Sequence, residues 1–206
     1  MKKIDIEHWP RKEHFLNFMA FEDPFFNICA DVKVTGLKQH AEKNNLSFFI
    51  LSYFQVLRVV NQIDAFKYRI RGKEVVLHEK IRGSCPVMRP GNTFGYGYFD
   101  YFDTLGDFEP HAKEVIRSVK NGKHLHPKFD EDDMIHSSVI PWVSFRSIEH
   151  AKRLNKGDSI PKIVLGKVYP KGDDHYMPVS VSGHHALMDG LHAGMFFEQY
   201  ESFRPI

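Results

Sequence analysis

The stretch that decides the fold covers residues 177–192 and reads MPVSVSGHHALMDGLH. Its first part, 177–183, alternates β-branched and small residues and is typical of a β-strand. A turn follows through His184 and His185, and a helical segment begins at Gly190. Turns at the end of a strand often carry reactive groups, because the scaffold holds them rigidly while ligands can still reach them.

The histidine pair in this turn indicates acid–base chemistry. An unperturbed imidazole titrates at about pH 6.5, so near neutrality it can accept a proton from a hydroxyl group. Asp189 follows His185 by four residues and could either orient an imidazole or close the turn through an ion pair. Spacing alone leaves two other interpretations open: a purely structural turn, and a metal site formed by His185, Asp189 and His192, which a helical backbone at His192 disfavours.

The rest of the chain alternates between strand-like and helix-like segments. Thr35 and Ser47 have the side chains of helix N-caps, and residues 120–133 form a long irregular stretch that suits a functional loop or an interface. Strands and helices that do not alternate regularly predict an α/β fold, a two-layer sandwich with a mixed β-sheet. Strands are expected at 25–34, 66–70, 75–78, 85–88, 94–99, 134–139, 162–168 and 177–183, and helices at 9–18, 37–43, 48–61, 106–120 and 191–203.

Length and charge restrict the class of protein. The chain has 206 residues, of which 42% are hydrophobic, so we expect a single domain covering residues 1–206. Its 28 basic and 26 acidic residues give a net charge of +2, and they are scattered rather than clustered. Binding to nucleic acid is therefore not expected.

Cysteine content and hydropathy predict the compartment. Cys29 and Cys85 do not make a disulfide framework and suit free thiols in a reducing environment. The N-terminus is charged and lacks the apolar core of a secretory signal. No stretch approaches the roughly 20 apolar residues that span a membrane. We therefore expect a cytoplasmic protein that does not associate with membranes.

Five segments, taken in order along the chain, resemble those of the chloramphenicol acetyltransferase family. The run 184–190 resembles the signature His-His-x-x-x-Asp-Gly, which dihydrolipoyl acyltransferases, plant acyltransferases and peptide-synthetase condensation domains share. Four further segments, together with the length of the chain, favour the single-domain, trimeric branch. They are WPRKEHF at 9–15, Thr93-Phe94, SVIPWVSF at 138–145 and GKVY at 166–169.

The resemblance implies a mechanism and its residues. The second histidine, His185, would be the general base that deprotonates an acceptor hydroxyl as it attacks the thioester of acetyl-CoA, the co-substrate. The hydroxyl of Ser138 would stabilise the oxyanion, although Ser137 is adjacent. Asp189 would pair with Arg11 to support the turn. No metal is expected.

The resemblance also implies a homotrimer with active sites at the subunit interfaces. The 18 Phe and 8 Tyr residues suit both a large interface and an apolar acceptor pocket for a small molecule. Phe18, Phe94 and Leu125 would line that pocket, and Trp142 would lie along the coenzyme A tunnel. Each of the three pocket residues would equally suit an ordinary core position.

Two departures from the family concern the acceptor. Val164 occupies a position where the family has a threonine that helps hold a water, and valine cannot form a hydrogen bond through its side chain. Glu22 and Asp23 stand where the family has small or apolar residues. The leading hypothesis is a chloramphenicol O-acetyltransferase, an enzyme of antibiotic resistance. The alternatives are a related coenzyme A-dependent acyltransferase with another hydroxyl acceptor, or a non-catalytic ligand-binding trimer.

Overall fold

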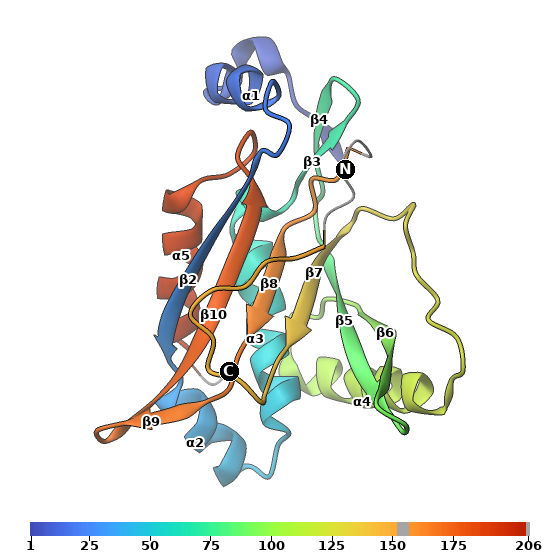
Figure 1. Cartoon of the computed structure of the whole chain (residues 1–206), viewed down its shortest axis with the longest axis vertical. Helices are drawn as coiled ribbons and strands as arrows, with labels where there is room; N and C mark the ends of the chain where they lie inside the picture. Colours follow the sequence, from blue (N-terminus) through green and yellow to red (C-terminus); the bar gives the residue numbers. More distant parts are fainter. Residues whose placement is uncertain (152–156, 205–206) are drawn as a thin grey trace.

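A seven-stranded mixed β-sheet organises the computed structural model, which describes residues 1–151 and 157–204 (Figure 1). The strand order is β2-β10-β8-β7-β5-β6, and β9 pairs with the outer part of β10. The strands are β2 (Phe25–Lys33), β5 (Arg82–Arg89), β6 (Thr93–Phe99), β7 (Met134–Val139), β8 (Lys162–Leu165), β9 (Tyr169–Lys171) and β10 (Asp174–His184).

Strand directions confirm the mixed sheet. β7 runs parallel to both β5 and β8, whereas β10 is antiparallel to β2 and β8. Strands β5 and β6 form a hairpin, and the chain returns to β7 through the long helix α4 (Leu105–Asn121), as a parallel connection requires.

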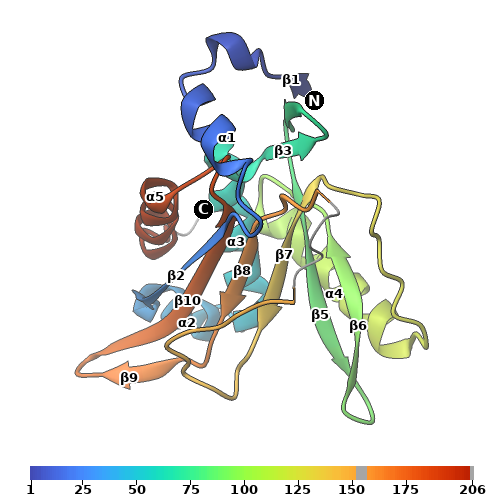
Figure 2. The same ribbon diagram turned by 45° about the horizontal axis from the view of Figure 1, so that its top comes forward.

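Helices α2 to α5 cover one face of the sheet (Figures 1 and 2). Helix α3 (Phe48–Gln62) is buried over most of its length, and Ser47 caps it as predicted by accepting a hydrogen bond from the backbone N–H of Ile50. The other two helices of this layer are α2 (Thr35–Lys43) and α5 (Gly190–Glu201). No helix in the described ranges is long and apolar enough to cross a membrane.

Side-chain alternation gives the sheet two different faces. Val179, Val181, Ile163 and Leu165 belong to the main hydrophobic core beneath the helices. Their neighbours along the same strands point to the opposite face, because successive side chains of a strand alternate. Most polar residues of β7, β8 and β10 lie on this opposite face, and Ser137 of β7 is an exception.

A smaller unit packs where β10 ends. It contains a three-stranded sheet in the order β1-β4-β3, of β1 (Lys2–Lys3), β3 (Tyr68–Arg71) and β4 (Glu74–Leu77), together with the helix α1 (Lys12–Phe18) and the short 3-10 helices η1 (Ile6–His8) and η2 (Asp64–Phe66). The β3–β4 hairpin turns at Gly72, whose φ of 63° favours glycine. Phe15, Ile70, Val75, Ala186 and Leu187 form a second core that joins this unit to the histidine turn.

Several predicted boundaries are wrong for identifiable reasons. Thr35 does not cap α2 but is its first residue, and its hydroxyl instead donates to Asp174 and accepts from the backbone N–H of His175. The strand expected at 162–168 ends at Leu165; the Gly166 N–H still bonds to the Pro178 carbonyl of β10, and the chain then turns away before β9. Helix α1 begins at Lys12 rather than residue 9.

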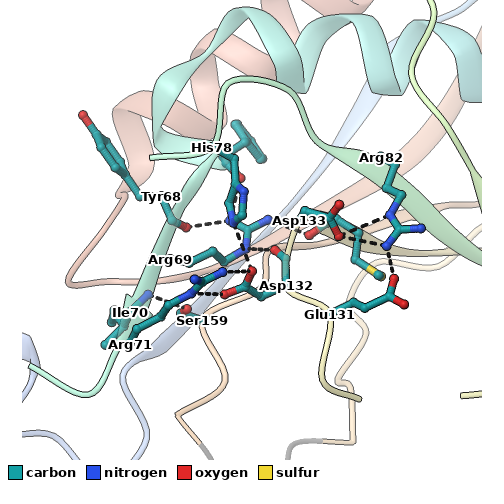
Figure 3. A network of polar contacts seen from close by, with 12 residues as sticks. Tyr68, Arg69, Ile70, Arg71, His78, Arg82, Glu131, Asp132, Asp133 and Ser159 are labelled. Atoms are coloured by element: carbon teal, nitrogen blue, oxygen red, sulfur yellow. Dashed lines mark hydrogen bonds and ion pairs between the residues drawn. The ribbon is translucent and has the colours of Figure 1, made fainter. Parts of the chain in front are cut away.

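A buried arginine fastens the long 120–133 stretch to the hairpin (Figure 3). Arg69 is fully buried, and its guanidinium donates to the backbone carbonyls of Phe66, Tyr68, Asp132 and Met134 at 2.5–2.8 Å. Burial lowers its pKa to about 10, against the opposing effect of nearby carboxylates, so it stays charged at neutral pH. The hydrogen bond to Asp132 thus attaches the irregular stretch to the β3–β4 hairpin.

Candidate active site

The two histidines of the turn have different environments. His184 is the last residue of β10, is buried, and accepts a hydrogen bond at Nδ1 from the backbone N–H of Ala186. Burial lowers the pKa of His184 to about 4, so this ring is neutral at physiological pH. His184 therefore supports the turn, which leaves His185 as the candidate base.

Aromatic rings hold the imidazole of His185. The ring of Phe18, at the end of α1, stacks on it with centroids 3.9 Å apart and planes 5° from parallel. The ring centroid of Phe26 of β2 is 5.2 Å from that of His185, with the two planes tilted by 55°. The His185 backbone N–H donates to the Pro24 carbonyl at 2.8 Å. Within the described residues, Nδ1 is buried and has no hydrogen-bond partner, which makes Nε2 the candidate nitrogen for proton transfer.

Arg11 ties the whole turn to the N-terminal segment. Its Nη1 lies 2.6 Å from the carboxylate of Asp189, its Nη2 donates to the His185 carbonyl at 3.0 Å, and its Nε donates to the Ala186 carbonyl at 3.1 Å. The planar guanidinium of Arg11 thus holds the backbone carbonyls of His185 and Ala186 together with the Asp189 carboxylate. A lysine could not reproduce this geometry.

Asp189 has a second partner set at the start of α5. Its side chain accepts from the backbone N–H of Leu191 and lies 2.9 Å from Nδ1 of His192, and its own backbone N–H donates to that Nδ1 at 3.2 Å, which closes a capping box. Burial raises the pKa of Asp189, but Arg11 and His192 outweigh that effect and hold it at about 2. His192 therefore caps the helix, and no group of three or more potential metal ligands occurs in the part of the chain that the structure describes.

The Arg11–Asp189 pair should be measurable by a double-mutant cycle. The two side chains are 14% and 28% exposed, between a surface pair and a buried one, so we expect a coupling free energy of about 2 kcal/mol from urea unfolding of Arg11→Met, Asp189→Asn and the double variant. Because the pKa of Asp189 is depressed in the folded state, this contribution is present above about pH 4 and is lost as the pH falls toward 2. A coupling below about 0.5 kcal/mol would contradict it.

Ser137 and Ser138 point to opposite faces of β7. Ser137 is buried on the helix side, where its hydroxyl accepts a hydrogen bond from Tyr53 of α3 at 3.4 Å. Ser138 is partly exposed on the opposite face, in register with Val164, which is itself in register with Ser180. Only Ser138 can therefore approach a ligand on that face, which supports choosing it over its neighbour.

The other predicted pocket residues do not gather around His185 within one chain. Phe18 contacts it, but Phe94 belongs to β6, the strand at the far edge of the sheet, and Leu125 lies beside that strand, where its carbonyl accepts from the Tyr96 N–H. Both are exposed, as is Trp142, which follows β7.

The structure locates the residues that differ from the family's usual ones. Val164 is fully buried on the Ser138 face, with no side-chain group to hold a water. Glu22 and Asp23 are exposed in the turn before β2, where Asp23 accepts from the Phe25 N–H at 3.2 Å.

With this geometry described, comparison with known proteins decides the family. The family model for chloramphenicol acetyltransferase matches residues 1–201. The chain belongs to the chloramphenicol acetyltransferase family. It is 25% identical over 201 residues to a chloramphenicol acetyltransferase of Proteus mirabilis, covering 97% of this chain and 93% of that one. It is 27% identical over 199 residues to chloramphenicol acetyltransferase 2 of Escherichia coli, covering 94% and 92%.

Solved structures agree with this assignment. One chloramphenicol acetyltransferase superposes with a TM-score of 0.90 at 29% identity and covers 98% of this chain and 99% of the other. A probable dihydrolipoamide acetyltransferase of Listeria monocytogenes shares the fold alone, with a TM-score of 0.66 at 15% identity, covering 92% and 87%. As a member of the chloramphenicol acetyltransferase family, the chain is an acyltransferase.

The sequence analysis did not predict a cluster of polar residues on the face of the sheet opposite the helices. His136 of β7 lies 2.8 Å from the Ser84 hydroxyl, and Lys162 of β8 pairs with Asp158 at 2.9 Å. Lys162 is almost completely buried and lies 4.3 Å from the centroid of the Phe25 ring. These residues carry no motif, because only strand pairing brings them together.

Proposed function

We propose that this acyltransferase moves an acetyl group from acetyl-CoA to a hydroxyl of chloramphenicol, and so confers resistance to the drug in the cytoplasm. The observation that carries the proposal is the family's histidine turn, in which His185 is partly exposed and its backbone is held by Arg11. His185 takes the proton of the acceptor hydroxyl while the oxygen attacks the thioester carbonyl. The oxyanion accepts a hydrogen bond from Ser138, and collapse breaks the C–S bond as His185 returns the proton to the sulfur.

Strand register supports an active site shared between subunits of a homotrimer. Ser138 is in register with Ser180, two strands away, and His184 lies four residues further along β10. Strand geometry puts these positions about 13 Å apart along the sheet and about 10 Å across it. A base and an oxyanion donor must both contact one reacting carbonyl, so His185 of one subunit would act with Ser138 of the next.

A cavity on the helix side of the sheet suits the pantetheine arm of coenzyme A. It measures about 610 Å³, and its lining includes Trp142, Val139 and the apolar side chains of Phe48 and Leu165, with Lys120 and Lys167 among the polar lining residues. Val139 is the last residue of β7 and directly follows Ser138, whose side chain lies on the opposite face of the sheet, so a thioester in this cavity would reach the oxyanion donor by passing the end of β7. The two lysines would attract the phosphates of the coenzyme.

The proposal predicts a difference between adjacent serines. Ser138→Ala should lower kcat by about 10²-fold because the oxyanion loses its donor. Ser137→Ala should change kcat by less than about threefold, since its hydroxyl faces Tyr53 beneath the sheet. Both are measured by release of coenzyme A thiol with chloramphenicol and acetyl-CoA. Equal losses in the two variants would remove Ser138 from the mechanism.

A second candidate is the same chemistry on another hydroxyl compound. The buried Val164 and the exposed Glu22 and Asp23 favour it, because they change the residues near the acceptor but not His185 or Ser138. Thiol release by the wild-type protein distinguishes the two candidates. Release with chloramphenicol supports the first; no release with the drug but release with another alcohol supports the second. Tight binding of the drug without turnover would favour a non-catalytic trimer.

A further inference from the structure

A cavity of about 630 Å³ opens on the sheet face opposite the helices. Neighbouring strands supply polar residues to its floor: Ser84 from β5, His136 from β7 and Lys162 from β8. Strand pairing aligns them, because Ser84 is in register with His136 and His136 with Lys162. Tyr96 of β6 also lines the cavity. The floor is therefore a row of hydrogen-bonding groups on rigid strands.

This row lies beside the candidate oxyanion donor. His136 precedes Ser138 by two residues on β7, so both side chains point to the same face at a spacing of about 7 Å. Tyr96 contacts Phe94 on the cavity's outer side, with ring centroids 5.7 Å apart. A molecule whose hydroxyl is acylated beside Ser138 would thus have the rest of its body over His136.

The floor of this cavity is electrically neutral. Burial lowers the pKa of His136 to about 4, so its imidazole is uncharged at neutral pH. The charge of Lys162 is balanced by Asp158 at 2.9 Å. With Nδ1 of His136 at 2.8 Å from the Ser84 hydroxyl, the pair can present Nε2 as a donor or as an acceptor, depending on which partner holds the proton.

An apolar fragment would fit this floor badly. It would displace water from His136 without offering a hydrogen bond, and leaving a buried polar group unpaired reduces affinity by about tenfold or more. A neutral hydrogen-bonding group would instead offer a hydrogen bond to Nε2 of His136. Charged residues elsewhere in the lining include the carboxylates of Asp130, Glu131 and Asp132 and the ammonium group of Lys128.

We infer that the acceptor carries a hydroxyl, amide or carbonyl group about 7 Å from the hydroxyl that is acylated, and that His136 binds this second group and selects for it. The inference rests on the proposed function and specifies the substrate class of that site. His136 is a specificity-determining residue here, not the base.

Two probes and three variants test it. Chloramphenicol is the polar probe and 2-phenylethanol, an aryl alcohol with one hydroxyl, is the apolar one. His136→Phe should raise KM for chloramphenicol about tenfold while kcat changes by less than about threefold, and should reduce the preference for chloramphenicol over 2-phenylethanol. His136→Asn keeps a donor and an acceptor and should restore most of the KM. His8→Phe, an exposed histidine of η1, is the matched control and should behave as wild type.

The outcomes separate this inference from the proposed function. An unchanged KM in His136→Phe, or an equal loss in His136→Asn, overturns the inference even if the enzyme acetylates the drug. If the wild-type protein releases no thiol with chloramphenicol, the proposed function fails. The inference is then tested by calorimetry, which compares the affinities of the wild-type protein and the His136 variants for the two probes. Failure of the wild-type protein to bind chloramphenicol overturns it. If His136→Phe does not fold, Ser84→Ala, which frees Nδ1, should raise KM about threefold.

Discussion

Replacing His185 by alanine should lower the rate of acetyl transfer by roughly 10²–10⁴-fold, the contribution expected of a positioned general base. Without the imidazole, the acceptor hydroxyl must lose its proton to water at a site where Phe18 and Phe26 exclude solvent from one side of the ring. KM should change little, because the base acts on the reacting proton rather than on the body of the acceptor. Thiol release at saturating acetyl-CoA measures the effect.

A control must show that the loss is chemical and not structural. His8→Ala removes an exposed histidine from η1 and should leave the rate within about twofold of wild type. The melting temperature of His185→Ala should remain close to that of the wild-type protein, because Arg11 holds the turn through backbone carbonyls and Asp189, none of which the substitution removes. Wild-type turnover by a folded His185→Ala protein would refute the mechanism.

Replacing Arg69 by methionine should reduce the free energy of unfolding by about 4 kcal/mol. Methionine fills a similar space but donates no hydrogen bond, so the carbonyls of Phe66, Tyr68, Asp132 and Met134 lose this buried donor. Two of them belong to the stretch that leads into β7, so the polar floor beside it should also loosen. Urea unfolding monitored by circular dichroism measures the change.

Arg71 is the matched control on the same strand. It lies two residues from Arg69 in β3 but binds the carboxylate of Asp132 from the surface, with 44% of its side chain exposed. Exposed pairs contribute little, so Arg71→Met should cost less than about 1 kcal/mol. Similar losses for the two variants would mean that burial of Arg69 is not what stabilises the segment.

The elements that could be predicted from sequence were those with strong local signals. Ser47 before the segment 48–61 predicted α3, and the strands expected at 66–70 and 75–78 correspond to β3 and β4, the hairpin that turns at Gly72. The prediction for Thr35 was wrong because a threonine hydroxyl can bond to any nearby partner, and in the folded chain it bonds to Asp174 and His175 instead of capping α2.

The sequence by itself determined the family, the alternation of strands and helices, and the residues of the histidine turn, because these depend on local patterns and ordered motifs. Tertiary structure alone decided which members of adjacent pairs face a ligand. His184 and His185, like Ser137 and Ser138, are chemically equivalent along the chain and differ only through burial and strand direction. It also brought Arg11 to Asp189 and assembled Ser84, His136 and Lys162 into one floor. Contacts between residues far apart in the chain depend on how strands pair, which no local sequence pattern specifies.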